Sequence, residues 1–538
     1  MNEVKKLIFN GDIITINSNL DQSEIEAVAI EGEKIIGVGS IDKLRNLLDE
    51  NYEEINLEGH CILPGFIDSH IHPILYIFFL LSPDLSNLRS LSELKSFLKE
   101  NIKNKNKEKI ILCLKLNEEN FKNPILPKKW DLDEAVPDHP IFLLRYDFHI
   151  GVANSKALEI AGINENTIPP DGGEIRKNKN RELNGVISEQ ALSLIFSQIE
   201  LPTLEEIKRG AERAFKNLAK RGITSIHGVF QADSGGEFGD LGALEIPIYK
   251  SILEKILQNT YSLTSTQNPK KLIHLKNTSI DLENKYGKFK LGGLKLFLDG
   301  TFGAATACLF KEFTDKPNKK GYCVVELDEI YEQMLEAHKL GFQVAVHAIG
   351  DKGNRILVDL YKELLKEFPK LNHRHRIEHA SMLKNDVIKD MKELGLIASC
   401  QPPFLNSEYK WLEKRLGKER CKYTYPFKSI IDSGVILTAG SDCPVEDPDV
   451  IMGIHAMVNR NGFIPEECVS VEEAIKAYTI NGAYASFQED IKGTIEKGKL
   501  ADFVILNENP LKIPKNEIKN LKILETIIRG ETVYKRES

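Results

Sequence analysis

The run Pro-Gly-Phe-Ile-Asp-Ser-His-Ile-His-Pro at residues 64–73 constrains this chain more than any other feature. Side chains alternate along a strand, so His70 and His72 project to the same side, roughly 7 Å apart. A Pro-Gly turn precedes the apolar residues and Pro73 ends the pattern, which places the pair at the C-terminal end of a short strand. A TIM barrel carries its chemistry at that end of its strands. Two surface histidines on a strand are the alternative interpretation.

Four later apolar runs each end in a residue type that binds metals. They carry Lys295 with Asp299 (residues 293–300), His347 (342–348), His379 (375–380) and Asp442 (435–442). A lysine within an apolar strand is costly unless it is paired or neutral. His373 and His375 share strand parity with His379 and are alternative ligands, but His375 lies about 13 Å further down the strand. Glu378, on the opposite parity, is expected to pair outside the barrel interior.

Together these residues predict a site for one or two divalent ions. The predicted ligands are His70, His72, Lys295, His347, His379 and Asp442. Imidazole with carboxylate favours zinc, although iron, nickel, cobalt and manganese are compatible. If the neutral amine of Lys295 captures carbon dioxide, the resulting carbamate bridges two ions. If Lys295 is instead an ammonium paired with Asp299, only a one-metal site is expected.

The same residues predict a hydrolytic mechanism. Coordination by a metal lowers the pKa of bound water towards neutrality. Asp442 is expected to take a proton from the attacking water and to deliver it to the leaving amine. The ion near His347 and His379 is expected to polarise the scissile carbonyl, which makes His379 a catalytic residue together with Asp442.

The ordered motifs resemble those of the amidohydrolase superfamily, specifically its Amidohydrolase 3 branch. The resemblance covers essentially the whole chain and rests on residues 64–72, 145–149, 154–158, 172–175, 222–225, 294–300, 347–351, 440–442 and 493–503. It implies a metal-dependent hydrolase of carbon–nitrogen bonds other than peptide bonds, with amide or N-acyl substrates. A deaminase, a cyclic-amide hydrolase or an esterase with the same site are alternatives. A further alternative is a non-catalytic scaffold protein that retained the fold.

The loops expected around the site depart from the pattern of this branch. Phe148 replaces the glycine of Arg-x-Asp-Gly-His, and the loop after Asp299 lacks the arginine common in relatives. Expected substrate-binding residues are His149, Phe148, Asp299 and Gln401. The aromatic residues among these loops predict an apolar pocket.

The resemblance also implies the domain organisation. The fold class is α/β, with a TIM-type (β/α)8 barrel, a composite β-sandwich built from both termini and an inserted cap domain. The expected ranges are 1–58 with 490–538 for the sandwich, 59–84 with 203–489 for the barrel and 85–202 for the α/β cap.

Composition limits the partners. A net charge of −8 without charge blocks argues against binding of nucleic acid or an anionic membrane. Eight scattered cysteines without Cys-x-x-Cys are typical of reduced thiols in a cytoplasmic protein. The polar first 20 residues do not resemble a signal peptide, and the longest apolar run, residues 74–81, is too short to span a bilayer. The expected partner is a small-molecule substrate, and a homodimer is an expected assembly.

Overall fold

The computed structural model describes residues 4–17, 19–48, 51–103, 105–146, 150–170, 173–199, 202–234, 239–286 and 288–537. The chain forms two compact units, one with Met1–His72, Phe215–Val229 and Ile256–Ser538, the other with Pro73–Ala214 and Phe230–Lys255. No helix among the described residues combines the length and the apolar character that crossing a bilayer requires.

Eight strands form one sheet whose neighbours follow one another along the chain. They are β7 (Phe66–Ile71), β13 (Ile223–Gln231), β14 (Asn259–Ser265), β15 (Phe289–Phe297), β16 (Gln343–Ala348), β17 (Arg376–His379), β18 (Ile397–Cys400) and β19 (Ile436–Ala439). The sheet closes where the N–H of Asp442 donates to the carbonyl of His70 at 2.7 Å, and that of His72 to the carbonyl of Cys443 at 2.8 Å. The predicted TIM-type barrel is confirmed.

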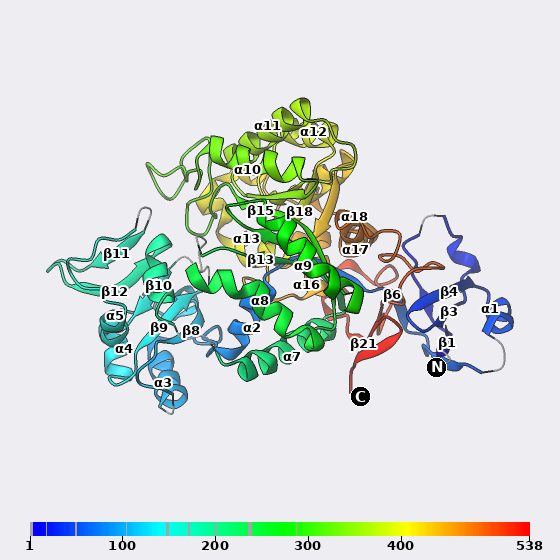
Figure 1. Ribbon diagram of the computed structural model, residues 1–538, viewed down its shortest axis with the longest axis horizontal. Coiled ribbons are helices and arrows are strands. Elements are labelled where there is room, and N and C mark those ends of the chain that lie inside the picture. The colour runs from blue at the N-terminus through cyan, green and yellow to red at the C-terminus, as the bar shows by residue number, and fades with distance from the viewer. Residues whose placement is uncertain are drawn as a thin grey trace. The chain divides into compact units, whose positions relative to one another are not determined.

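Helices alternate with the barrel strands, as parallel pairing requires. They include α7 (Leu204–Lys220), α8 (Glu245–Ser251), α9 (Lys271–Tyr286), α10 (Leu327–Lys339), α11 (Asp351–Glu367), α12 (Asn385–Leu394), α13 (Pro402–Leu416), α14 (Lys418–Cys421), α15 (Phe427–Asp432), α16 (Val450–Asn459), α17 (Val471–Ala477) and α18 (Ile480–Ala485). In α11, drawn green in Figure 1, Leu357, Tyr361 and Leu364 recur at helical spacing and are buried. That spacing gives the helix one apolar face for the core.

Strands from both ends of the chain form two further sheets. The first contains β1 (Lys5–Phe9), β3 (Ala27–Glu31), β4 (Lys34–Gly39) and β5 (Glu53–Asn56). The second contains β2 (Asp12–Ile13), β6 (Cys61–Pro64), β20 (Phe503–Leu506), β21 (Ile523–Ile528) and β22 (Glu531–Lys535), so the blue and red strands of Figure 1 pair directly. One apolar cluster joins residues of both sheets, among them Ile8, Val28, Ile62 and Phe503. The composite sandwich is confirmed.

The second unit contains a mixed sheet and its own apolar core. Its strands are β8 (Ile111–Leu116), β9 (Ile141–Arg145), β10 (Ile150–Ala153), β11 (Glu174–Lys177) and β12 (Leu183–Ser188). Its helices include α2 (Pro73–Leu81), α3 (Leu91–Ile102), α4 (Lys129–Ala135), α5 (Ser155–Ile160) and α6 (Ser193–Phe196). Leu94, Leu98, Leu143 and Val186 pack in one of its buried clusters. The role of residues 85–202 as a cap over the site stays a prediction.

Candidate metal centre

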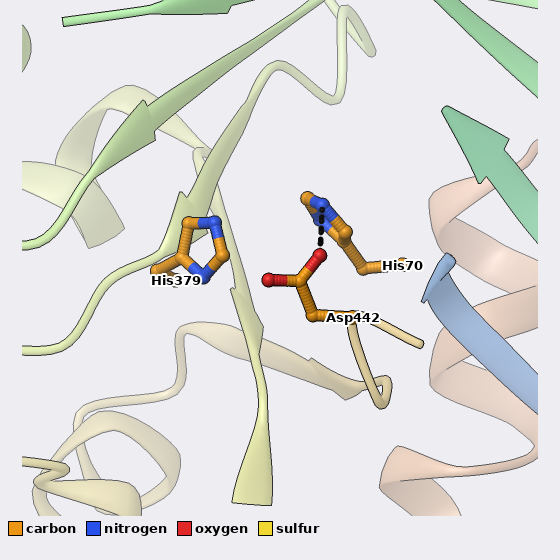
Figure 2. Close-up of side chains that lie close together, drawn as sticks. All are labelled: His70, His379 and Asp442. Atoms are coloured by element: carbon orange, nitrogen blue, oxygen red, sulfur yellow. Dashed lines mark ion pairs between the residues drawn. The ribbon is translucent and has the colours of Figure 1, made fainter. Parts of the chain in front are cut away.

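Three residues from separate barrel strands converge at one point (Figure 2). His70 lies near the end of β7, His379 ends β17, and Asp442 follows β19. One ligand atom of each lies within 4.8 Å of the others, and all three residues are buried. The Nε2 atom of His70 is 3.4 Å from Oδ1 of Asp442. The barrel therefore brings His70 next to two residues that lie more than 300 positions later in the sequence.

His72 extends this cluster. Its Nε2 atom is 3.1 Å from the same Oδ1 of Asp442, and the ring centroids of His70 and His72 are 5.6 Å apart. Its side chain is 21 % exposed, against 1 % for His70. The His-x-His pair thus contributes two imidazoles to one carboxylate, as the alternation of the strand predicts.

The backbone turns sharply at two of the candidate ligands. His379 has a φ of 71° and Asp442 a φ of 59°, in the left-handed region that residues other than glycine seldom adopt. Such a conformation costs about 1–3 kcal/mol and persists only where the surroundings enforce it. It interrupts strand alternation, so adjacent residues no longer have to face opposite sides of the sheet.

Glu378 accordingly lies inside the barrel, contrary to the expectation from its parity. Its Oε2 atom is 2.5 Å from Nδ1 of His70, and Arg376 donates to both of its carboxylate oxygens at 2.6 and 3.0 Å. Arg376 also donates to the carbonyl of Ser69 at 2.7 Å and lies 2.9 Å from Nδ1 of His227. Arg376 and Glu378 are both fully buried. Burial opposes ionisation of Glu378, but the charge of Arg376 holds the pKa of that carboxyl well below its usual range.

This arrangement determines which nitrogen of His70 faces the candidate site. The carboxylate of Glu378 accepts the Nδ1–H of His70, which leaves the Nε2 lone pair directed at Asp442. A carboxylate behind a histidine in this way fixes the ring of a metal ligand and raises its basicity. A glutamate beside a ligand histidine was visible in the sequence, but its partner on another strand was not.

His347 and Asp299 lie beside His379. The ring centroids of His347 and His379 are 4.3 Å apart, and Nε2 of His347 lies 3.3 Å from the carbonyl oxygen of Gly300. Oδ1 of Asp299 is 3.5 Å from that nitrogen and accepts the N–H of Ile349, while Oδ2 accepts those of Gly350 and Cys308. Asp299 therefore anchors the loop at the end of β16. Its predicted contact with substrate stays a prediction.

Lys295 is fully buried on β15. Its Nζ atom donates to the carbonyl of Leu296 at 3.2 Å and lies 3.6 Å from the centroid of the Phe297 ring. Its charge contributes to the pKa values of His70, His347, His379 and Asp442, which places it within electrostatic reach of all four.

Burial keeps His70, His347 and His379 neutral. Burial, assisted by the charge of Lys295, lowers the pKa of His347 to about 3. Burial also lowers the pKa of His70, and that of His379 falls well below its usual value. Burial alone would raise the pKa of Asp442, but the hydrogen bond from His72 and nearby charges bring it below the ordinary value. Neutral imidazoles and an ionised carboxylate are the forms that coordinate metals.

The residues present therefore suit a divalent ion. Nδ1 of His379 is buried and has no hydrogen-bond partner among the described residues, an arrangement that leaves a polar atom unsatisfied unless a metal ion accepts its lone pair. Nitrogen and carboxylate donors from three strands surround one point, and one imidazole is oriented from behind by Glu378. This donor set is typical of zinc and of other first-row metals.

The other sequence candidates lie as follows. Nε2 of His375 is 2.8 Å from Nδ1 of His338, and its own Nδ1 accepts the N–H of Val344, so its ring is engaged away from the cluster. Gln401 is buried directly after β18, and its Oε1 has no hydrogen-bond partner within the part of the chain that the structure describes. Phe148 and His149 lie outside the described residues. Contact of Gln401 with substrate stays a prediction.

Comparisons with known proteins agree with this geometry. The chain matches the model of the Amidohydrolase family over residues 53–534. It is 32 % identical to the putative amidohydrolase YtcJ of Bacillus subtilis, over 99 % of this chain and 100 % of that protein. It is 25 % identical to the N-substituted formamide deformylase of Arthrobacter pascens, over 98 % of both chains.

Among solved structures, an uncharacterized metal-dependent hydrolase from Pyrococcus furiosus is similar with a TM-score of 0.73 and 31 % identity. The match covers 94 % of this chain and 100 % of that one. The barrel, the converging ligand-type residues and the match along nearly the whole length support the same assignment. The chain belongs to the amidohydrolase family and is a hydrolytic enzyme.

Proposed function

We propose that the enzyme hydrolyses the carbon–nitrogen bond of a small amide or N-acyl compound in a metal-dependent reaction. The observation that carries this proposal is the convergence of His70, His379 and Asp442 within 4.8 Å at the ends of three barrel strands. Full-length similarity to an N-substituted formamide deformylase supports an N-acyl bond as the target.

The metal would be held by His70, His72 and Asp442, with His379 close enough to share it. A divalent ion bound there, zinc being the one that the donors favour, would acidify a water molecule and polarise the scissile carbonyl. His347, His379 and Lys295 would hold a second ion if Lys295 carries a carbamate. With an unmodified Lys295, we expect a single ion.

Asp442 acts as the proton carrier in this proposal. Its carboxylate is ionised at neutral pH and has 11 % of its side chain exposed, so it can accept a proton from the attacking water. The same carboxylic acid then protonates the leaving nitrogen, so that an amine rather than an amide anion departs. The hydrogen bond from His70 to Glu378 fixes the orientation of the imidazole during both steps.

An aromatic ring adjoins the cluster and suits an apolar substrate group. The ring of Phe404 stacks against His379 with centroids 6.1 Å apart. Apolar and aromatic surfaces with few charges favour a substrate whose acyl or amine part is uncharged.

The test is a panel of N-formyl and N-acyl amines with matched apolar and charged substituents, together with cyclic amides, esters and amino-substituted heterocycles. Release of amine and acid is measured by mass spectrometry on metal-loaded enzyme. We expect turnover of apolar N-acyl amines and a loss of about 10³-fold or more in Asp442→Asn, because the proton carrier is removed. Exclusive turnover of heterocyclic amines, or faster turnover of charged amides throughout, would refute the proposed substrate class.

Asp447→Asn serves as the matched control. Asp447 pairs with Arg221 and its side chain is 60 % exposed. The control should retain the activity of the parent enzyme.

A further inference from the structure

Two cysteines meet in the loop that follows β15. Their sulfur atoms, Sγ of Cys308 and Sγ of Cys323, are 3.8 Å apart. Cys308 is 3 % exposed, and Cys323 is half-buried. The two residues are only 15 positions apart, so the loop itself brings the thiols together.

The backbone around the pair is held firmly. The N–H of Cys308 donates to Oδ2 of Asp299 at 2.8 Å, and Asp299 pairs with Cys323 in an antiparallel bridge. The carbonyl of Cys308 accepts the N–H groups of Lys352 and Gly353 in the first turn of α11, at 3.1 and 3.0 Å. Both thiols therefore stand on backbone that the barrel fixes, which keeps them within reach of one another.

The pair opens into a cavity. The volume of this cavity is about 380 Å³, and its lining includes Cys308, Cys323, Phe310, Lys320, Tyr322 and Lys352. A space of this kind admits a small reagent to the thiols. Among the lining residues, Lys352 favours the anionic form of the sulfur.

The groups that surround the pair shift the pKa values of the two thiols in opposite directions. The hydrogen bond with Cys308 and the charge of Lys352 lower the pKa of Cys323 to about 7, although burial and Glu326 act in the opposite direction. The same hydrogen bond, burial and the charge of Asp299 raise the pKa of the Cys308 thiol. By contrast, burial raises the pKa of Cys113 to about 12 and that of Cys421 to about 11.

We propose that Cys323 and Cys308 form a thiol-reactive modification site, in which Cys323 attacks hydroperoxides and Cys308 then closes a disulfide. In the first step the sulfur of Cys323 bonds to one peroxide oxygen and the O–O bond breaks. Sulfur is oxidised to a sulfenic acid, and the other oxygen leaves as water or an alcohol after taking a proton. In the second step the sulfur of Cys308 attacks that of Cys323, the S–O bond breaks and water leaves.

The second step requires little rearrangement. The sulfurs must approach from 3.8 Å to about 2.05 Å, which lies within reach of side-chain rotation and a small backbone shift. The disulfide would include Cys308, whose backbone N–H donates to Asp299. Asp299 in turn lies beside His347. The modification therefore lies next to the candidate metal centre without using any of its ligands.

The experiment uses the metal-loaded enzyme, reduced and then freed of reductant. A stoichiometric amount of hydrogen peroxide is added, remaining thiols are blocked with iodoacetamide, and peptides are mapped by mass spectrometry. We expect a disulfide-linked pair of peptides containing Cys308 and Cys323. In Cys308→Ser, dimedone should trap a sulfenic acid at Cys323, whereas Cys323→Ser should give neither product.

Cys468 provides an internal reference, because it is also half-buried and burial raises its pKa. At pH 7 we expect iodoacetamide to label Cys323 at least about threefold faster than Cys468. This figure combines a larger thiolate fraction with the weaker nucleophilicity of a more acidic thiol. The pH profile of labelling at Cys323 should have its midpoint near 7. Equal labelling of the two cysteines, or peroxide oxidation without a link between Cys308 and Cys323, would overturn the proposal.

Discussion

Replacement of Glu378 by glutamine tests whether a buried ion pair supports the candidate metal centre. Glu378 and Arg376 are both fully buried, and three short contacts converge on the Glu378 carboxylate. Glutamine keeps the shape and one acceptor oxygen, but it leaves the guanidinium of Arg376 without a counter-charge. It also replaces the carboxylate behind His70 with a neutral amide.

The structure sets the expected magnitude. Removing one partner of a buried ion pair costs about 3–5 kcal/mol. Because glutamine retains one acceptor, we expect the lower end, about 3 kcal/mol, which lowers Tm by about 3 °C in a cooperative unit of several hundred residues. Loss of the carboxylate behind a ligand histidine typically costs about 10–100-fold in metal affinity. Both effects should therefore appear in one variant.

The assays are thermal unfolding followed by circular dichroism and metal affinity measured by competition with a chromogenic chelator. Glu472→Gln is the matched control, since its exposed pair with Lys476 contributes less than about 0.5 kcal/mol. The double variant Arg376→Met with Glu378→Gln should recover part of the lost stability, because the unpaired charge is gone. A change in Tm below that of the control, with unaltered metal affinity, would refute the reasoning.

Further predictions concern pH dependence and barrel closure. Burial lowers the pKa of Lys492 from 10.5 to about 7. Between these two pH values the amine is protonated in the unfolded chain but neutral in the folded chain, so protonation favours unfolding increasingly as pH falls. In denaturant titrations at pH 7, the free energy of unfolding of Lys492→Met should exceed that of the parent by up to about 5 kcal/mol, less about 1 kcal/mol for the lost hydrogen bond to Ser225. The two free energies should converge as pH rises towards 10.5. A difference that does not change with pH would contradict this. In Gly440→Ala, the new Cβ would lie 2.5 Å from the backbone nitrogen of His70, so we expect a loss of about 1–3 kcal/mol and of bound metal. Gly303→Ala is the control, because the nearest atom to its new Cβ is 4.0 Å away. If Gly440→Ala and Gly303→Ala changed Tm and metal content equally, close packing at Gly440 would not be what the barrel closure requires.

The sequence was sufficient to predict the barrel, because apolar runs ending in ligand-type residues alternate with helical patterns along the chain. The same simple alternation correctly predicted that His70, in β7, and His72, directly after it, project to the same side, where both approach one carboxylate. It also singled out Asp442, which lies beside His70 and His379, because a strand end followed by a turn is visible without knowledge of its partners. Each of these predictions rests on local periodicity, which a single sequence contains.

Local periodicity failed at the backbone turn of β17. The positive φ of His379 interrupts alternation, so the inward position of Glu378 was not predictable from its parity. The bond between Arg376 and His227 joins residues that are 149 positions apart, and only barrel closure brings them together. The contact between Cys308 and Cys323 likewise depends on the path of a loop that carries no periodic pattern.

Metal stoichiometry tests the central claim most directly. Elemental analysis would be applied to the enzyme purified without chelator, to Lys295→Ala and to Lys290→Ala, a control on the same strand. We predict about two ions per chain in the parent and in the control, falling to about one or fewer without Lys295, as a carbamate-bridged pair requires. About one ion in all three proteins would indicate a mononuclear site in which Lys295 is structural. Metal content near zero in the parent, with no gain on incubation with zinc, would contradict the assignment of a metal centre.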